Sequence, residues 1–159
     1  MAKKKVKFVV NGQQVSLEVR QDERLVDVLR NELGLKGTKT GCREGECGTC
    51  SVILNGKIVP SCLVPVMKAD GGTIVTVEGL EHEGELHPLQ RSFIEKGAVQ
   101  CGFCTPGMLL AAKNLLDHNP EPTEGEIRRA ISGVLCRCTG YRKIVQAIQA
   151  VAEIMKASR

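Results

Sequence analysis

Eight cysteines fall into two groups whose spacing is typical of metal-binding sites. In the first group, Cys42, Cys47 and Cys50 follow a C-x4-C-x2-C pattern, and Cys62 comes twelve positions after Cys50. Three thiolates in one loop with a distant fourth is a spacing that holds a [2Fe-2S] cluster. The loop over 36–50 also carries four glycines, which allow a tight curl with positive φ and bring backbone N–H groups towards the sulfurs.

The second group consists of two close pairs, Cys101 with Cys104 and Cys136 with Cys138. Each pair could hold one edge of a small cluster if the two loops face each other. The eight cysteines divide into two sets of four with none left over. This division predicts two metal sites and no free thiol nucleophile.

Zinc and disulfides are the alternatives to iron. A structural zinc ion also takes four thiolates, and C-x2-C is a common half of such a site, so spacing alone leaves zinc open for the second group. The basic start of the chain resembles a signal sequence, but the apolar stretch over 6–10 is interrupted by Lys7 and is short. We therefore expect a reducing cytoplasm, where cysteine sets bind metal more often than they form disulfides.

Composition narrows the function classes. Apolar residues make up 42% and charged residues 25% of the 159 positions, as in a folded globular protein. Only 3% are aromatic, which argues against a module that stacks nucleic-acid bases. No run approaches the ~18 apolar residues of a membrane span. The net charge of +4 includes Lys3, Lys4 and Lys5, which we interpret as a solvated end.

Residues 1–80 are predicted to form an α+β domain with a β-grasp sheet. Alternating apolar residues on either side of Asn11-Gly12 and of Asn55-Gly56 predict two β-hairpins. A helix is expected from Leu25 to Leu33, with Asp22 as its cap and Gly34 at its end, and a last strand over 73–77.

Residues 81–159 are predicted to form a four-helix bundle of two similar halves. Helices are expected over 88–96, 106–118 with Thr105 as cap, 123–132 with a Thr123–Glu126 capping box, and 142–156. In each half a cysteine pair precedes a helix. Two helix N-termini would then approach one site, and their partial positive charge favours an anionic cluster.

Three segments resemble the iron–sulfur subunit of the molybdenum hydroxylase (xanthine dehydrogenase) family: KGTKTGCREGECGTC over 36–50, QCGFCTPG over 100–107 and LCRCTGY over 135–141. The resemblance implies an N-terminal plant-type ferredoxin-like domain and a C-terminal all-α [2Fe-2S] domain. It also implies an electron-transfer subunit of an oxidoreductase, in which two clusters pass electrons from a molybdopterin centre on another chain to FAD or another acceptor.

The same resemblance implies the site residues and the partners. Gln100 and Cys138 are expected to approach the pterin. The partners would be a large molybdopterin-binding subunit and a medium FAD-binding subunit, in a dimer of heterotrimers, with no nucleic acid. The implied iron ligands are Cys42, Cys47, Cys50, Cys62, Cys101, Cys104, Cys136 and Cys138.

Other positions receive smaller roles. Thr49 and Val134 depart from the residues common in the family, Ala and Asn, and neither is expected to touch a ligand. Tyr141 is interpreted as a packed aromatic at a helix start. The three histidines, His82, His87 and His118, are expected at the surface or at caps. A zinc-stabilised binding module and a free-standing two-cluster ferredoxin are the alternative functions.

Overall fold

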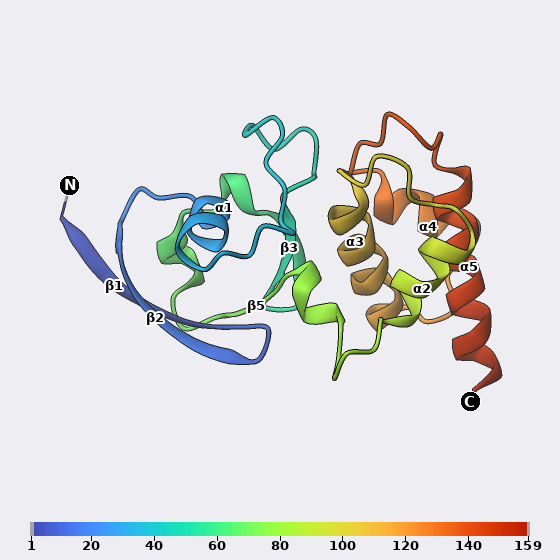
Figure 1. Cartoon of the computed structure of the whole chain (residues 1–159), viewed down its shortest axis with the longest axis horizontal. Coiled ribbons are helices and arrows are strands. Elements are labelled where there is room, and N and C mark those ends of the chain that lie inside the picture. Colours follow the sequence, from blue (N-terminus) through green and yellow to red (C-terminus); the bar gives the residue numbers. More distant parts are fainter. Residues whose placement is uncertain (1, 159) are drawn as a thin grey trace.

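Five strands in the first half of the chain form one sheet, and the helices of the second half lie to one side of it (Figure 1). The structure is a computed structural model that describes residues 2–158. The mixed α+β class expected from the sequence is confirmed. The sheet has the order β2-β1-β5-β3-β4, with β1 at Lys3–Val10, β2 at Gln13–Arg20, β3 at Ser51–Leu54, β4 at Lys57–Pro60 and β5 at Thr73–Val75.

Both predicted hairpins are present. Asn11 and Gly12 turn between β1 and β2 with φ of 49° and 81°, and Asn55 and Gly56 turn between β3 and β4 with φ of 49° and 78°. Such paired positive φ values suit Asn-Gly in a two-residue turn. β5 ends earlier than the predicted strand over 73–77, because a 3₁₀ turn begins at Val77.

The helix expected from Leu25 to Leu33 is present in altered form. It begins as α1 (Leu25–Asp27) and continues as a π-helical turn at Val28–Glu32. The prediction that Asp22 caps it is wrong. The capping position is Arg24, without a side-chain hydrogen bond. The carboxylate of Asp22 instead pairs with the Arg20 guanidinium at 2.7 Å, and this hydrogen bond lowers the pKa of Asp22.

The sheet has a core on each face, because neighbouring strand residues point to opposite sides. On β3, Val52 packs into the core that contains Leu25 and Leu29 of the α1 region. Its neighbour Ile53 packs into the core of the helical half, which contains Met108. The middle of the sheet therefore lies between the α1 region and the helices.

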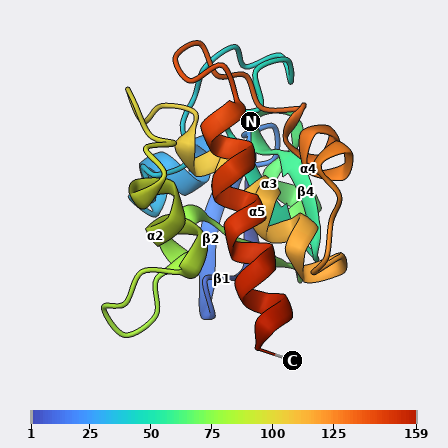
Figure 2. The ribbon, with the colours of Figure 1, turned by 90° about the vertical axis from the view of Figure 1, so that its right-hand side faces the viewer.

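The second half contains the four expected helices. Figure 2 shows α5 running between α2 and α4, and α5 contacts both. The last helix buries an apolar stripe that includes Val145, Ile148 and Val151. No helix within residues 2–158 is long and apolar enough to cross a membrane. The helices are α2 at Pro88–Glu95, α3 at Thr105–His118, α4 at Glu124–Ile131 and α5 at Arg142–Ala157.

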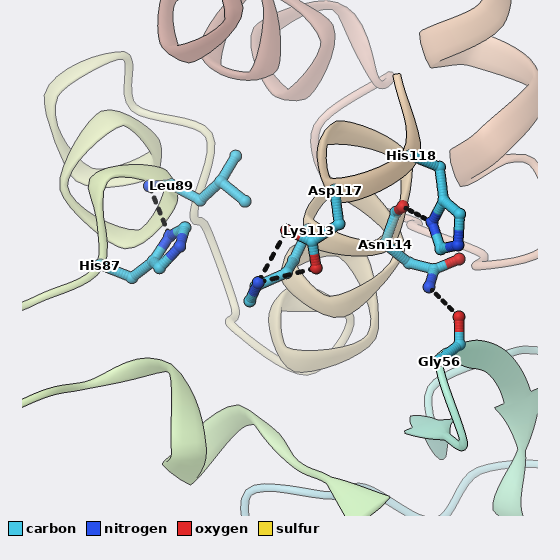
Figure 3. Close-up of polar contacts among 7 residues, drawn as sticks. All are labelled: Gly56, His87, Leu89, Lys113, Asn114, Asp117 and His118. Carbon is cyan, nitrogen blue, oxygen red and sulfur yellow. Dashed lines mark hydrogen bonds and ion pairs between the residues drawn. The ribbon is translucent and has the colours of Figure 1, made fainter. Parts of the chain in front are cut away.

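In the second half of the chain, the helix caps agree with the predictions at α2 and α4 but not at α3. Thr123 and Glu126 form the expected capping box at α4. His87 caps α2 through a hydrogen bond that its ring accepts from the Leu89 backbone N–H (Figure 3). Thr105 does not cap α3. It is the first residue of that helix, and Cys104 takes the capping position without a side-chain hydrogen bond.

Candidate iron–sulfur sites

The loop over 36–50 curls around Cys42, Cys47 and Cys50. Gly45 and Gly48 have φ of 82° and 67°, which favour glycine. Gly41 serves a different purpose, because a Cβ there would lie 2.8 Å from the Cys47 sulfur. The glycines therefore shape a cradle around the sulfurs. We call the set Cys42, Cys47, Cys50 and Cys62 the loop site.

Cys42 and Cys47 form the outer pair of the loop site. Cys42 Sγ accepts hydrogen bonds from the backbone N–H groups of Glu44 at 3.4 Å and Cys47 at 3.3 Å. In turn, Cys47 Sγ accepts from Cys42 N–H at 3.4 Å. The bonds from Glu44 and Cys47 lower the pKa of the Cys42 thiol to about 7. Such donors favour the anionic thiolate, the form that binds metal.

Cys50 and Cys62 form the inner pair, which is buried with Val26. Burial raises the pKa of the Cys50 thiol to about 11, and the neighbouring Cys62 side chain adds to this effect. A bound cation would offset the cost of these buried charges, because metal binding displaces the thiol protons. The distant fourth cysteine thus reaches the loop as the sequence predicted.

The second group of cysteines lies where two helices begin. Cys104 caps α3, and the loop with Cys136 and Cys138 leads into α5. Side chains interact in two pairs, Cys104 with Cys136 and Cys101 with Cys138. Cys104 is buried, whereas Cys101 and Cys138 are exposed. We call the set Cys101, Cys104, Cys136 and Cys138 the helix-start site.

Each thiol of the helix-start site has its own electrostatic setting. Burial raises the pKa of Cys104 to about 12. Burial also opposes ionisation of Cys136, but hydrogen bonds from the Thr139 hydroxyl and backbone outweigh it and lower its pKa. The Cys101 side chain raises the pKa of Cys138.

Tyr141 and Thr139 support Cys136 in a way that the sequence analysis missed. The Tyr141 hydroxyl accepts a hydrogen bond from the Cys136 backbone N–H at 2.9 Å. Thr139 places its hydroxyl 3.0 Å from Cys136 Sγ and donates its N–H to the same sulfur at 3.4 Å. Tyr141 is packed at the start of α5, as predicted. The spacing of Thr139, three positions after Cys136, is the sequence signal that could have predicted this contact.

One prediction about the departures from the family pattern is wrong. Thr49 does touch a predicted ligand, since its hydroxyl lies 3.2 Å from Cys47 Sγ. The error arose because Thr49 lies two residues beyond Cys47, and only the curl of the loop turns its side chain back. Val134, which follows Gly133, is buried in the core of the helical half.

The two sites meet through the backbone. Leu135 donates its N–H to the carbonyl oxygen of Cys47 at 2.9 Å, and Leu135 is bonded directly to Cys136. A Cβ at Gly48 would lie 1.9 Å from the carbonyl oxygen of Gly133, so only glycine fits. In Figures 1 and 2 the loop over 36–50 and the loops before α3 and α5 lie on one side of the molecule. Away from the cysteines, a second hydrogen bond links the two halves of the chain. Asn114 Nδ2 in α3 donates to the Gly56 carbonyl in the β3–β4 turn at 2.8 Å (Figure 3).

The other predicted residues lie at the surface or at a helix cap. Gln100 is exposed next to exposed Cys101. His82 and His118 are exposed and His87 is a cap, as expected. Within residues 2–158, no three His, Cys, Asp or Glu side chains converge on one ion position. The thiols are instead arranged in pairs, which suits a cluster whose two irons each take two cysteines.

The donor set therefore fits two [2Fe-2S] clusters. Each site offers four thiols, and backbone N–H groups point at sulfurs in both. In the loop site the cradle has space that a Cβ at Gly41 would fill. In the helix-start site the first turn of α3 directly follows Cys104, and helix N-termini favour anionic groups.

Comparison with known families assigns both halves to iron–sulfur domains. Residues 8–77 match the 2Fe-2S iron–sulfur cluster binding domain, and residues 76–149 match the [2Fe-2S] binding domain. The chain is 50% identical to the nicotinate dehydrogenase small FeS subunit of Eubacterium barkeri over 96% of its own length and 98% of that protein. It is 43% identical to the aldehyde oxidoreductase of Megalodesulfovibrio gigas over 96% of its length, but spans 17% of that protein.

Solved structures show the same likeness. The quinoline 2-oxidoreductase of Pseudomonas putida 86 contains a chain that superposes with a TM-score of 0.94 at 43% identity, covering 99% of this chain and 98% of that one. The aldehyde oxidoreductase of Desulfovibrio gigas superposes with a TM-score of 0.92 at 43% identity, covering 98% of this chain and 17% of that one. The fold thus occurs both as a separate chain and as part of a longer one.

Proposed function

Because the chain belongs to the family of small iron–sulfur subunits of molybdenum hydroxylases, we propose that it relays electrons from a molybdopterin centre on a larger partner subunit. The electrons pass singly through two [2Fe-2S] clusters to FAD or another acceptor. The catalytic molybdenum site lies on the partner, and this chain catalyses no bond chemistry itself. A [2Fe-2S] cluster supplies a one-electron carrier whose potential depends on hydrogen bonds to its sulfurs and on exposure.

The proposal divides the chain into a ferredoxin-like domain over 1–80 and a four-helix bundle over 81–159. Two separate hydrophobic cores support this division, one between the sheet and the α1 region and one between the other face of the sheet and the helices. The two family matches, which end at 77 and begin at 76, support a boundary in this region. Contacts of α5 with α2, α3 and α4 support the bundle.

All eight cysteines act as iron ligands in this proposal, and their side-chain pairs support an assignment of two cysteines to each iron. In the loop site, Cys42 and Cys47 would hold one iron, and Cys50 and Cys62 the other. In the helix-start site the pairs are Cys101 with Cys138 and Cys104 with Cys136. The pairing of Cys104 with Cys136 would join the start of α3 and the loop before α5 at one iron.

The main structural support for the electron relay is the hydrogen bond from Leu135 N–H to the Cys47 carbonyl. It connects the backbone of a loop-site ligand to the residue before a helix-start ligand. The close approach of Gly48 to Gly133 holds this connection without an intervening side chain. Two one-electron carriers linked in this way form a short path through packed protein.

The exposure of the helix-start site supports a proposed arrangement of the partners. Cys101, Cys138 and Gln100 are exposed, so the helix-start site can face the large subunit, with Gln100 and Cys138 towards the pterin. The loop site would then face a medium FAD-binding subunit. We propose a dimer of such heterotrimers in the cytoplasm. The likeness to the separate small subunit of Eubacterium barkeri, matched over 98% of its length, supports a separate partner chain.

Metal analysis tests the cofactor. The purified chain should hold about four iron atoms and show the visible spectrum of [2Fe-2S] clusters. Cys62→Ser and Cys104→Ser are a matched pair, because each removes a buried ligand from one site. Each variant should lose one cluster signal and keep the other in electron paramagnetic resonance. A colourless protein with zinc in place of iron would sink the proposal.

Isolation from the native source tests the subunit role. The 17.2 kDa chain should purify with a larger molybdenum-containing partner. Reduction of the complex by its substrate should then reduce both clusters. A lone chain that carries two clusters and binds no larger subunit would instead support a free-standing ferredoxin.

A further inference from the structure

The side chain of Thr49 lies against the sulfur of Cys47. Its hydroxyl oxygen is 3.2 Å from Cys47 Sγ, and the residue is 4% exposed. Within residues 2–158, this sulfur is the partner that the structure provides for the hydroxyl. The loss of this partner would destabilise the folded protein, because water does not reach a buried hydroxyl to replace the hydrogen bond. The contact is therefore a fixed part of the loop site.

The direction of this hydrogen bond follows from the chemistry of the sulfur. A free thiol could donate or accept, but a thiolate bound to iron carries no proton. The Thr49 hydroxyl must then donate to Cys47 Sγ. The same sulfur accepts from the Cys42 N–H at 3.4 Å, so it receives one backbone and one side-chain donor.

The surrounding backbone leaves room for the hydroxyl and holds it in place. A Cβ at Gly41 would lie 3.1 Å from the Thr49 hydroxyl oxygen and 2.8 Å from Cys47 Sγ. On the other side, a Cβ at Gly107 in α3 would lie 3.5 Å from Thr49 Cα. Thr49 is thus packed between the loop and the first turn of α3.

We propose that Thr49 is a positioning residue that raises the reduction potential of the cluster held by the loop site. This inference rests on the function proposed above. Reduction adds negative charge to the cluster and its sulfurs, so a hydroxyl donor stabilises the reduced state more than the oxidised one. The hydroxyl makes the loop site a better acceptor for an electron from the helix-start site.

A purely structural role for Thr49 predicts a different pattern. Replacing Thr49 by Val keeps the size and removes the hydroxyl, whereas Ser keeps the hydroxyl and removes a methyl group. If Thr49 only fills space, Ser should disturb the site at least as much as Val. If the hydroxyl matters, Val should shift the potential and Ser should not.

The test is a potentiometric titration of the holo-protein followed by electron paramagnetic resonance. Thr49→Val should lower the loop-site potential and reduce the equilibrium constant for its reduction about three- to tenfold, where tenfold corresponds to about 59 mV for one electron. Thr49→Ser should stay near the wild-type value. The helix-start potential should not change in either variant.

A second variant covers the case in which Thr49→Val does not assemble. Thr49→Ala also removes the hydroxyl, so it should lower the loop-site potential, whereas Thr49→Ser should not. Resonance Raman spectra in H₂O and D₂O separate the hydroxyl from the Cys42 N–H, which also exchanges: the isotope shift of the iron–cysteine stretching band should be smaller in Thr49→Ala than in the wild type and Thr49→Ser. An unchanged potential in Thr49→Val, or equal shifts in Val and Ser, would overturn the inference. Absence of iron or of two cluster signals in the wild type would overturn the proposed function instead.

Discussion

The loop site and the helix-start site hold the same four-thiol donor set in different backbone settings. In the loop site, glycines with positive φ curl the chain, and two of the four thiols are buried. In the helix-start site, the starts of two helices and a hydrogen bond to the Tyr141 hydroxyl position the cysteines, and two thiols are exposed. Thiol pairing can thus be specified mainly by the shape of the backbone, as in the loop site, or with support from side chains at a helix start, as in the helix-start site.

The largest effect is expected from adding a methyl group at a glycine of the loop site. In Gly48→Ala the new Cβ would meet the Gly133 carbonyl at 1.9 Å, so the two halves must separate locally. We expect a loss of about 3 to 5 kcal/mol, measured as a fall in the apparent Tm of the holo-protein at a fixed scan rate.

Gly140→Ala is the matched change at the helix-start site. Gly140 has a similar φ of 63°, but a Cβ there meets nothing within 4 Å. Only the left-handed backbone is then disfavoured, at about 1 to 2 kcal/mol. Equal losses in Gly48→Ala and Gly140→Ala would contradict the idea that close packing distinguishes the loop site.

The next effect concerns the side-chain support of the helix-start site. Tyr141→Phe removes the acceptor of the Cys136 N–H and leaves that donor without its partner. We expect a loss of about 1 to 2 kcal/mol and a faster loss of the helix-start cluster signal on warming.

Ser61→Ala provides the comparison in the loop site. The Ser61 hydroxyl donates to the Cys50 carbonyl at 2.6 Å, but that carbonyl also accepts the Ser61 N–H at 3.2 Å. The carbonyl keeps one partner in the variant, so the loss should be about half that of Tyr141→Phe. If Ser61→Ala lost more stability than Tyr141→Phe, the idea that side chains support the helix-start site more than the loop site would be wrong.

A pH-dependent loss of stability is expected next, at α2. Burial lowers the pKa of His87, and Lys113 adds to this while Asp117 opposes it. The neutral ring accepts the Leu89 N–H (Figure 3), and protonation of that nitrogen removes the acceptor. Because the folded pKa lies below the unfolded one, the contribution is complete above the unfolded pKa of ~6.5 and is lost as pH falls through the folded pKa.

His87→Asn isolates this titration. Asn keeps an acceptor at the N-cap but does not titrate, so the variant should lose less stability than the wild type between pH 7 and pH 5. Apparent Tm values across this range measure the difference. Parallel curves for the two proteins would show that His87 does not contribute.

The smallest effect is expected from the second hydroxyl–sulfur contact. Thr139 is half-buried, so water can partly replace its hydroxyl beside Cys136 Sγ. Thr139→Val should lower the helix-start potential by a two- to threefold change in the equilibrium constant, less than Thr49→Val changes the loop site. A potentiometric titration of both variants compares them, and a larger shift in Thr139→Val would contradict the ranking by burial.

Local sequence signals predicted most of the elements. Asn-Gly turns and strand alternation predicted both hairpins, and the Thr123–Glu126 box predicted the start of α4. Each of these features depends on residues close together in the chain. The π-helical turn at Val28–Glu32 was not predictable in this way, because Val28 and Leu29 pack into a core with residues of distant strands. The cap was predicted wrongly for a local reason, since the Asp22 carboxylate pairs with Arg20 and not with the helix.

The sites follow the same rule. Spacing predicted the two sets of cysteines, and the structure brings each set together in pairs. The contacts of Thr49 and Tyr141 with cysteines were missed, because a loop must be folded before the direction of its side chains is known. The contact of Cys47 with Leu135 joins residues 88 positions apart, which no local pattern could indicate.

The close approach of Gly48 to Gly133 also constrains how segments of this protein could be exchanged with those of its relatives. A backbone-to-backbone approach leaves no side chain that could adjust to a new neighbour. A chimera that takes its first half from one relative and its second half from another must therefore bring two loops of matching curvature. The loop over 36–50 and the loop before α5 would have to be inherited as one unit, although half the chain separates them.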